Sequence, residues 1–543
     1  MRRVLLLAAL AALVLPGASQ AARFAVGVSP HADVTRLRDA LDVRGLGRGE
    51  SLGPLQAIVV DAPDRSALRG LPGASYVELL GARRPAFTPN DPLVAKQWYV
   101  AQNRAYDAWD SLPQLLAVQV ALIDSGVDAS HPDLASRIAD AKSFVGGSAR
   151  VDKQGHGTFV AGLIAAETDN GVGIAGLSPS AELLVAKVVT ADRTIPVEAE
   201  ARAIRWAVAE GAKVINMSLG GVRDPLDPSD DSYSPLEAAA IAYAVKKNVV
   251  VVAAVGNADQ APSTPWRFAS YPAALPHVLG VSALARSGAS PSFSNRDAVY
   301  NDIAAPGEDI VSTLPRGLTS PYKDCAEQGY SLCGPDEYRH AEGTSFAAPQ
   351  VSAAAATVLA VRPGLSAEQV VWLLERYAVD VNAANGCKAC PPRRDRYTGW
   401  GRLDIAAALK GLDGPIPSRD RYEPNDEAAG RAVQIFGKQR RLEATLDYWD
   451  DQQDVYAVRL KRGQRMYAGL VGPARTDVNL VLWRPGTTAV DDLRAQTRRV
   501  TQSARPGARE YLAYRAKRGG LYYLQVKIAS SGGGRYRLTI VKT

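Results

Sequence analysis

Three stretches of the sequence each hold a residue whose side chain can take part in acyl transfer. Asp124 follows the apolar run VALI, His156 lies between glycines in GHGTFVAG, and Ser345 opens the Ala-rich stretch TSFAAPQVSAAAA. Acyl transfer needs a hydroxyl nucleophile, a base that takes its proton and a carboxylate that orients the base. Any one of these residues alone fits a turn or a helix cap. Together they supply one residue for each role.

The elements around these residues predict how they are positioned. Four apolar runs suit parallel strands buried on both faces, at 118–124, 183–189, 213–219 and 249–255. Ala-rich helical segments lie between them, at 199–211 and 234–248. This alternation over 87–411 predicts an α/β fold with a doubly wound, mostly parallel sheet. Residues at strand ends and helix starts then meet in one crevice, and the backbone N–H of Ser345 is free to donate to an oxyanion.

Two further regions flank this domain. Residues 22–86 predict a small α/β unit, with strands at 24–28 and 57–60 and helical spacing at 32–42 and 64–71. Residues 412–426 are rich in Gly, Pro and charge and predict a linker. Beyond them, short alternating segments between Gly/Pro turns predict an all-β sandwich over 427–543, with strands at 454–460, 466–470, 479–483, 521–526 and 536–540.

Length and composition exclude several classes of protein. A chain of 543 residues is long enough for more than one domain. The chain has 47% hydrophobic and 22% charged residues, which excludes collagen-like, coiled-coil and wholly disordered proteins. The formal net charge is +7, of which residues 1–86 carry +4. The remaining +3 is too small to argue for a nucleic-acid partner.

The first 21 residues have the pattern of a secretory signal peptide. Arg2 and Arg3 precede an apolar run over 4–15, which is followed by Pro-Gly and a small-residue cleavage site. A helix of this run would be about 18 Å long, too short for a bilayer core of about 30 Å. We therefore expect a secreted protein, extracellular or periplasmic, with no membrane span.

The four cysteines fall in two close pairs, and an oxidising compartment makes them candidate disulfides. Cys325 and Cys333 lie in a Gly-rich insertion, where we expect a loop disulfide. Cys387 and Cys390 form a C-x-x-C motif that also suits a redox or zinc site. No second Cys/His pair lies nearby in sequence and the compartment is secretory, so a tight disulfide is expected there too.

The order Asp, His, Ser and the three motifs resemble the subtilisin-like serine proteases, nearest to the thermitase-type secreted bacterial enzymes. The resemblance covers about 87–411 and implies that Asp124, His156 and Ser345 form the triad. It implies that Asn257 is the side-chain oxyanion donor. It also implies substrate-binding roles for residues of the segments SLGG and AAVG and one pocket position: Ser218, Leu219, Gly220, Gly221, Ala253, Ala254, Gly256 and Ser270. The small residue Ser270 at this pocket position implies a preference for large apolar P1 residues.

A structural calcium site is also implied by the resemblance. The loop TDNGVGI would supply the side-chain oxygen of Asn170 and backbone carbonyls, and two aspartates would add carboxylates. The full set is Asp91, Asp133, Thr168, Asn170, Val172 and Ile174. A tight Asn-Gly turn without a metal is the alternative.

Four positions depart from the family pattern, and none of them is a residue of the triad. Phe159 replaces a second histidine, Phe346 a methionine, Gln350 a histidine and Val255 an alanine.

The flanking regions resemble parts of such enzymes as well. Residues 22–86 resemble an inhibitory prodomain that the enzyme's own active site removes, and the mature chain would begin near Phe87. The C-terminal region resembles the bacterial pre-peptidase C-terminal domain, through RYEPND and GGLYYLQV among other segments. The leading hypothesis is a secreted, self-maturing, monomeric endopeptidase of broad specificity that acts on protein or peptide substrates.

Two alternatives remain. One is a narrow processing protease that cuts after basic residues, using Asp230 and Asp231. The other is a non-catalytic binding protein in which the β-module is the working part.

Overall fold

The computed structural model describes residues 22–30, 32–80, 87–109, 116–227, 229–319, 337–417, 421–449, 451–490, 497–530 and 532–543. These residues form two compact units, one that ends at residue 85 and one that begins at residue 86. Cys325 and Cys333 lie outside the described residues, as does the predicted signal peptide.

The first unit is a four-stranded antiparallel sheet packed against one helix. Its elements are β1 (Ala22–Val28), α1 (Val34–Val43), β2 (Glu50–Ser51), β3 (Ala57–Ala62) and β4 (Ala74–Leu79), with sheet order β2-β3-β1-β4. Leu37 and Leu41 of the helix are fully buried against the sheet. The helix predicted at 64–71 is wrong in extent. It is a single 3₁₀ turn, Arg65–Leu68, because Gly70 adopts a left-handed φ of 66° and Pro72 follows.

The second unit begins with a seven-stranded sheet in which every strand pair is parallel. The strands are β5 (Val118–Asp124), β6 (Ile138–Ser143), β7 (Ala181–Lys187), β8 (Val214–Met217), β9 (Val250–Ala254), β10 (Val278–Leu284) and β11 (Ile303–Pro306), in the order β11-β10-β9-β8-β5-β7-β6. A hairpin of β12 (Ile310–Thr313) and β13 (Tyr338–Ala341) lies outside this sheet. The predicted fold class is confirmed, since all four predicted strands belong to one parallel sheet.

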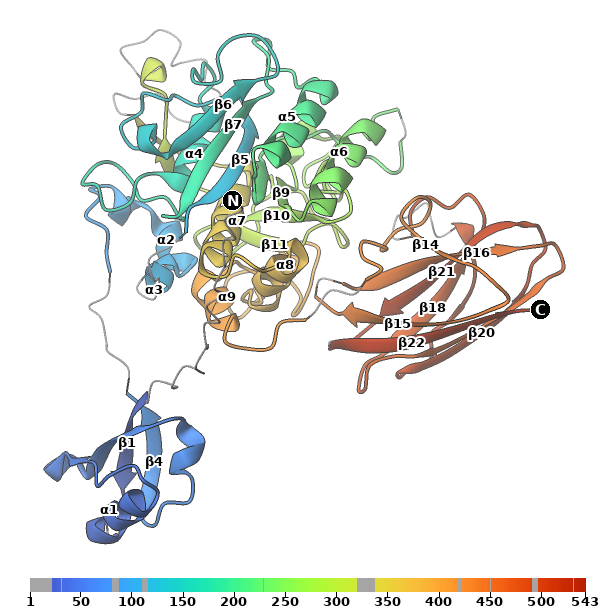
Figure 1. Cartoon of the computed structure of the whole chain (residues 1–543). Coiled ribbons are helices and arrows are strands. Elements are labelled where there is room, and N and C mark those ends of the chain that lie inside the picture. Colours follow the sequence, from blue (N-terminus) through green and yellow to red (C-terminus); the bar gives the residue numbers. More distant parts are fainter. Residues whose placement is uncertain are drawn as a thin grey trace, which may run out of the picture. The chain divides into compact units, whose positions relative to one another are not determined.

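Helices cover both faces of this sheet (Figure 1). One face packs on α5 (Val197–Ala209) and α6 (Pro235–Lys246). The other face packs on α4 (His156–Ala165), α7 (Thr344–Val361), α8 (Ala367–Arg376) and α9 (Ile405–Gly411), with the short α2 (Trp98–Gln102) and α3 (Ala105–Trp109) beside them. Among the described residues, α7 alone is long and apolar enough to cross a membrane, and 89% of its apolar window is buried inside the protein.

The C-terminal strands form two stacked sheets, as predicted. One sheet has the order β14-β16-β21-β18-β19 and the other β15-β22-β17-β20. The bounds are β14 (Val433–Ile435), β15 (Gln439–Asp447), β16 (Gln453–Leu460), β17 (Arg465–Val471), β18 (Val478–Trp483), β19 (Arg499–Ser503), β20 (Arg509–Arg515), β21 (Gly520–Ile528) and β22 (Gly533–Lys542). The core between the sheets holds alternate residues of both, such as Leu480, Leu524 and Leu538.

The sandwich also packs against the helical side of the parallel sheet. The ring of Trp449 lies 6.5 Å from the rings of both Trp372 and Trp400. The guanidinium of Arg376 lies 4.5 Å from the centre of the Trp449 ring. The sandwich and the helical side of the parallel sheet therefore share an aromatic contact.

Candidate active site

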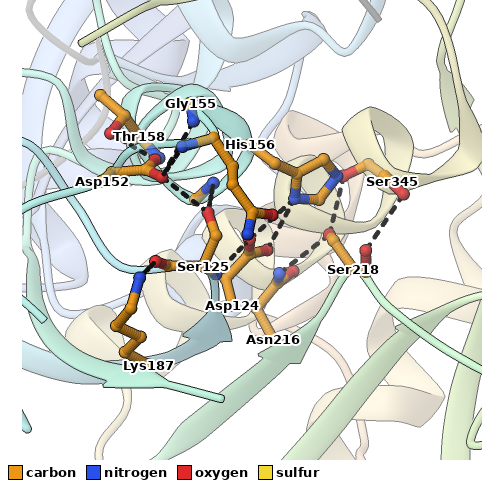
Figure 2. A network of polar contacts seen from close by, with 12 residues as sticks. Asp124, Ser125, Asp152, Gly155, His156, Thr158, Lys187, Asn216, Ser218 and Ser345 are labelled. Carbon is orange, nitrogen blue, oxygen red and sulfur yellow. Dashed lines mark hydrogen bonds and ion pairs between the residues drawn. The ribbon is translucent and has the colours of Figure 1, made fainter. Parts of the chain in front are cut away.

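Asp124 and His156 meet at the carboxyl edge of the parallel sheet (Figure 2). Asp124 is the last residue of β5, and His156 is the first residue of α4. The Nδ1 atom of His156 lies 2.8 Å from Oδ1 and 3.0 Å from Oδ2 of Asp124. Only 1% of the Asp124 surface is exposed, so its carboxylate acts on the imidazole through a medium from which water is largely excluded. This contact orients the ring and leaves Nε2 on the side away from Asp124.

Asp152 anchors the start of the helix that carries His156. Its Oδ1 accepts hydrogen bonds from the backbone N–H groups of Gln154 and Gly155, and its Oδ2 from the N–H and hydroxyl of Thr158. The hydroxyl of Ser125 also donates to Asp152, at 2.9 Å. One buried carboxylate thereby satisfies N–H groups that a helix start leaves without partners, and it ties α4 to the residue after Asp124.

The helix also comes close to the strand that carries the aspartate. A Cβ atom on Gly157 would lie 2.1 Å from the carbonyl oxygen of Gly126 and 3.2 Å from the Asp124 carboxylate. Glycine is therefore required beside the histidine for the hydrogen bond between His156 and Asp124 to form.

The surroundings of His156 change its acidity. Burial lowers the pKa of the imidazole, but the charge and hydrogen bond of Asp124 raise it, and so does the charge of Asp152. The net effect places the pKa above its ordinary value of 6.5. The imidazolium is therefore stabilised in the place where a base would receive a proton.

Ser345 lies beside His156 at the second position of α7 (Figure 2). Its hydroxyl donates to the carbonyl oxygen of Ser218 at 3.1 Å, and its own carbonyl accepts from the hydroxyl of Ser218 at 2.7 Å. Pro349 explains why that carbonyl is available, because a proline four residues later has no N–H to donate to it. Because of Pro349, the Ser345 carbonyl can accept the hydrogen bond from the Ser218 hydroxyl, and this bond fixes the serine next to the end of β8.

A buried polar chain continues from this contact. The side-chain amide of Asn216 donates to the hydroxyl of Ser218 at 3.0 Å, and the hydroxyl of Ser352 donates to the Asn216 oxygen at 2.8 Å. Asn216 and Ser352 are fully buried. The chain links the third turn of α7 to the end of β8 and holds the segment around Ser345 in place.

Asn257 is oriented by the residue before Ser345. Its side-chain oxygen accepts from the backbone N–H of Thr344 at 3.0 Å and from the Thr344 hydroxyl at 2.9 Å. These two bonds fix the amide so that the oxygen is occupied and the NH₂ group is left to donate. Asn257, Thr344 and Ser345 line the same cavity.

The cavity has a volume of about 320 Å³ and is bounded by most of the predicted substrate residues. Those that line it are Ser218, Leu219, Gly220, Ala254, Gly256 and Ser270. Two predicted residues do not line it. Gly221 is paired with Tyr271 through two backbone hydrogen bonds, and Ala253 is fully buried in the core.

Glycine at position 256 keeps one wall of the cavity open. Its φ is 93°, and a Cβ there would lie 2.2 Å from the Ser270 hydroxyl and 2.7 Å from the Asn295 amide nitrogen. The amide of Asn295 in turn donates to the Val255 carbonyl at 3.1 Å and to Ser270 at 3.3 Å. The wall is therefore made of small groups held by a buried hydrogen-bond network.

Two of the positions that depart from the family pattern, Phe159 and Phe346, pack together beside the catalytic histidine candidate. The rings of Phe159 and Phe346 are 4.5 Å apart, and Phe346 lies 5.6 Å from the His156 ring. Gln350 donates to the carbonyls of Pro306 and Phe346 and accepts from the Asn103 amide. The two phenylalanines fill one space, and neither takes part in the Asp124–His156 contact.

The predicted calcium ligands also come together. Asp91 and Asp133 are buried, with 2% and 0% of their surface exposed. The carboxylate of Asp91 accepts from the backbone of Asp169 at 2.8 Å, and Asp133 accepts from the Asn170 amide at 2.9 Å and from Ile174 N–H at 2.9 Å. Among the described residues, no lysine or arginine forms an ion pair with either aspartate. Thr168 and Val172 lie in the same loop, as the motif requires.

Burial, with a smaller contribution from the nearby charge of Asp91, raises the pKa of Asp133 to about 6, even though hydrogen bonds to the carboxylate lower it. Burial raises the pKa of Asp91 as well. Two buried carboxylates that repel one another, on a loop rich in oxygen ligands, fit a hard cation such as Ca²⁺.

Cys387 and Cys390 form a disulfide, with 5.3 Å between their Cα atoms. Both are buried in a small apolar cluster with Leu284, Val381 and Tyr397. A metal site at this motif is not supported, because both sulfur atoms are used in the bond.

Reasoning from the sequence missed two kinds of site residue. Asp152 and Asn216 support the candidate triad through buried hydrogen bonds, and Arg193 lines the cavity from the loop after β7. The D-x-x-G-H spacing was an available signal for Asp152, since an acidic residue just before a helix start suits N–H groups. Asn216 gives no comparable local signal, because its partners lie on other elements.

The sequence of this chain is similar to those of several known proteins. Residues 117–401 match the sequence profile of the Subtilase family, Peptidase S8. The thermophilic serine proteinase of Bacillus sp. (strain AK1) is 33% identical over 333 residues, which cover 61% of this chain and 71% of that protein. Thermitase of Thermoactinomyces vulgaris is 35% identical over 295 residues, which cover 54% of this chain and 92% of that protein. Among solved structures, a lanthipeptide protease is 25% identical with a TM-score of 0.49 and covers 61% of this chain and 100% of its own.

The matched profile spans just over half of the chain, and it includes Asp124, His156, Asn257 and Ser345. Residues 22–86 and 427–543 lie outside it. The chain belongs to the subtilase family of serine proteases.

Proposed function

We propose that this protease is a secreted endopeptidase in which Asp124, His156 and Ser345 form the catalytic triad. The observation that supports this most strongly is the contact of His156 Nδ1 with both carboxylate oxygens of Asp124, next to Ser345 at a helix start. In the reaction, Nε2 of His156 takes the proton of the Ser345 hydroxyl as its oxygen attacks the scissile carbonyl. The imidazolium then gives that proton to the leaving amine, and water later releases the acyl group by the same route.

Stabilisation of the oxyanion is assigned to Asn257 and the backbone N–H of Ser345. The Asn257 amide has its oxygen held by Thr344, so its NH₂ group is oriented before substrate arrives. Donors that are already oriented stabilise the charge that develops in the transition state without reorganising. In the structure the Ser345 hydroxyl donates to the Ser218 carbonyl, and a substrate would draw it toward His156.

The substrate is proposed to add as an extended strand beside Ser218, Leu219 and Gly220. The wall made by Ala254, Gly256 and Ser270 consists of small side chains, which leaves room for a large apolar P1 residue. Arg193 also lines this cavity, and its guanidinium group adds a positive charge there.

The alternative, cleavage after basic residues, receives no support from the cavity. Asp230 and Asp231 do not line it, and the Asp231 carboxylate accepts from the backbone of Asp224 instead. A cleavage-site profile on a mixed peptide library tests this choice. We expect large apolar residues at P1, and a profile dominated by Lys and Arg would favour the processing enzyme.

A structural calcium ion is proposed at Asp91, Asp133 and Asn170, with carbonyls of Thr168, Val172 and Ile174. The ion would balance the two buried carboxylates and tie the segment after residue 87 to the loop after α4. It has no part in the chemical steps.

Residues 22–86 are proposed to be a prodomain and intramolecular inhibitor, and residues 427–543 a separate sandwich domain. The first proposal is supported by the compact unit that ends at residue 85. Export is supported by the signal-like N-terminus and by a relative named cell wall-associated protease of Bacillus subtilis, 28% identical over 387 residues.

The decisive experiment for the triad is Ser345→Ala. Loss of the nucleophile should lower peptide hydrolysis by about 10⁶-fold and leave the chain at its full length, with residues 22–86 still attached. Ser287→Ala, in an exposed turn, is the matched control and should mature and hydrolyse normally. A folded Ser345→Ala protein that still hydrolysed peptides would exclude this serine as the nucleophile, and one that still lost residues 22–86 without added protease would exclude self-maturation.

A further inference from the structure

The formal charge of this chain is distributed unevenly between its domains. Residues 421–543 contain 23 Lys and Arg but 12 Asp and Glu, a net charge of +11. Residues 87–420 contain 29 Lys and Arg but 37 Asp and Glu, a net charge of −8. The modest charge of the whole chain is therefore the sum of a basic sandwich and an acidic peptidase domain. An excess of this size attracts polyanions over distances set by ionic strength.

The sheet β15-β22-β17-β20 forms one side of the sandwich (Figure 1), and part of this charge lies on its outer face. Alternation along these strands puts Leu442, Leu470, Leu512 and Leu538 in the core and the residues between them on the outside. We call the outward surface the basic tyrosine face. It is defined by Tyr467, Tyr511, Arg441, Arg465, Arg509, Arg515 and Arg537.

The centre of this face is an open pair of aromatic rings. The Tyr467 and Tyr511 rings are stacked, with 6.4 Å between their centres and 26° between their planes. Between β17 and β20 their cross-strand neighbours are small, since Tyr467 is opposite Ala513 and Tyr511 is opposite Gly469. On the β22 side Tyr467 is opposite Val541. A Cβ on Gly469 would meet nothing within 4 Å, and 61% of the Tyr511 surface is exposed. The exposed Tyr511 ring and the half-buried Tyr467 ring therefore form an aromatic platform on the sheet.

The arginines surround this platform. Arg465 is directly opposite Arg515 at one end, and Val471 separates Arg509 from Arg537 at the other. Like charges opposite one another destabilise a sheet, so this arrangement costs stability in the absence of an anion. The acidic Glu443 lies 3.3 Å from Arg537.

Three of these arginines have their guanidinium groups available. Within the described part of the chain, the side chains of Arg441, Arg465 and Arg509 make no hydrogen bond or ion pair. All three are exposed. Guanidinium groups pair in two-point fashion with carboxylate, sulfate and phosphate, and these three can do so without giving up a partner within the protein.

From these observations we infer that the basic tyrosine face binds an anionic polysaccharide. Tyr467 and Tyr511 would lie under the C–H faces of sugar rings and hydrogen-bond to sugar hydroxyls, while the arginines pair with carboxylate or sulfate groups. Single-stranded nucleic acid also uses stacking and basic groups, and some proteins bind it on an open sheet face, so it is the competing ligand. The predicted export of the chain favours polysaccharide. Binding would hold the enzyme at a matrix whose proteins it cuts.

The test uses the full chain carrying Ser345→Ala, so that self-digestion does not interfere. Binding to soluble polygalacturonate and to heparin is measured by calorimetry at two salt concentrations, with dextran as the neutral polysaccharide and a thymidine oligonucleotide as the nucleic acid. We expect both polyanionic sugars to bind, more weakly at high salt, and dextran not to bind. Tyr511→Ala should weaken binding by about three- to tenfold.

Combined Arg441→Gln, Arg465→Gln and Arg509→Gln should weaken binding by at least about tenfold and reduce its salt dependence. Phe436→Ala and Arg459→Gln are matched controls, since both residues are exposed on the sandwich outside this face. They should leave Kd within about twofold. In the active enzyme, all these variants should hydrolyse a short peptide as the parent does, which also separates this inference from the triad assignment.

Four outcomes would overturn the inference. The first is no binding to either anionic sugar, and the second is equal binding of dextran. The third is tighter binding of the oligonucleotide with the same dependence on Tyr511 and the arginines, which would make the ligand a nucleic acid. Equal losses in the control variants would show general charge attraction instead of a built face.

Discussion

The peptidase domain and the C-terminal sandwich build their functional surfaces in opposite ways. In the peptidase domain, short segments far apart in sequence converge at the carboxyl ends of buried parallel strands, and the polar groups there are held by buried bonds such as those of Asp152. In the sandwich, the basic tyrosine face is made of alternate residues on neighbouring antiparallel strands and lies in the open. The peptidase domain therefore fixes the positions of a few atoms, whereas the sandwich exposes many side chains over a wide area.

The two regions also differ in charge, −8 for residues 87–420 and +11 for residues 421–543. A negative peptidase domain would be repelled by an acidic matrix, whereas a positive sandwich would be attracted. The difference suggests a division in which one domain performs the chemistry and the other determines where it happens. If this division holds, changes in the peptidase domain should alter hydrolysis but not polysaccharide binding, and changes in the sandwich should do the reverse.

The largest effect after the nucleophile itself is expected for Asn257→Ala. Loss of this donor should lower kcat by about 10²- to 10³-fold with little change in KM, because the bond forms in the transition state. Kinetics on a short peptide measure this, and Asn385→Ala on an exposed loop is the control. Unchanged kcat would mean that the oxyanion is stabilised elsewhere. Binding of polysaccharide by the sandwich should not change.

Removal of calcium should destabilise the peptidase domain by about 3 kcal/mol if the ion is present at about a hundred times its Kd. The pH dependence has a defined sign. Without the ion, Asp133 holds its proton up to a pKa of about 6, so ion-free stability falls as the pH rises through that value. Bound calcium should restore the stability that is lost as the pH rises.

The shift in Tm caused by chelator, measured by calorimetry, should therefore be large at pH 8 and small at pH 5. Asp133→Asn should abolish the shift. The same shift at both pH values, or no shift in either protein, would contradict the site.

The contrast between the two regions also explains what the sequence could predict. The candidate triad and Asn257 lie in long local motifs, and the strands appear as apolar runs, so the sequence sufficed to predict the fold class and to name the candidate site residues. The Asn216–Ser352 contact and the Trp449 packing join residues far apart in sequence, and no local pattern carries them. The basic tyrosine face depends on which residues are opposite one another on neighbouring strands, and the sequence alone does not give that register. The negative charge of the peptidase domain also offsets the positive charge of the sandwich, so the net charge of the whole chain did not indicate this face.

A moderate effect is expected in the pH dependence of hydrolysis. Asp124 and Asp152 raise the pKa of His156, so the imidazole stays protonated and inactive to a higher pH than an ordinary histidine. Activity should therefore rise through a midpoint above 6.5 and then reach a plateau. A pH profile of kcat/KM on a neutral peptide measures the midpoint. A midpoint below the ordinary value would mean that burial outweighs the two carboxylates.

The smallest effect on catalysis is expected from removing the sandwich. A chain that ends after residue 417 keeps the candidate triad, Asn257, the calcium loop and the segment that packs on α8, where Gln369 donates to the Pro417 carbonyl. It should hydrolyse short peptides within about twofold of the full enzyme, because independent cores usually function independently. Binding to polygalacturonate should be lost.

Truncation also uncovers Trp372 and Trp400, against which Trp449 packs, so the yield of soluble protein should fall. A second variant, Trp372→Gln in the truncated chain, separates this exposure from catalysis by removing one apolar ring from the new surface. If either shortened chain folds but cannot cleave a short peptide, the sandwich completes the active site. The division between a domain that cuts and a domain that anchors would then be wrong, because the activity of the peptidase domain would depend on its aromatic contact with Trp449.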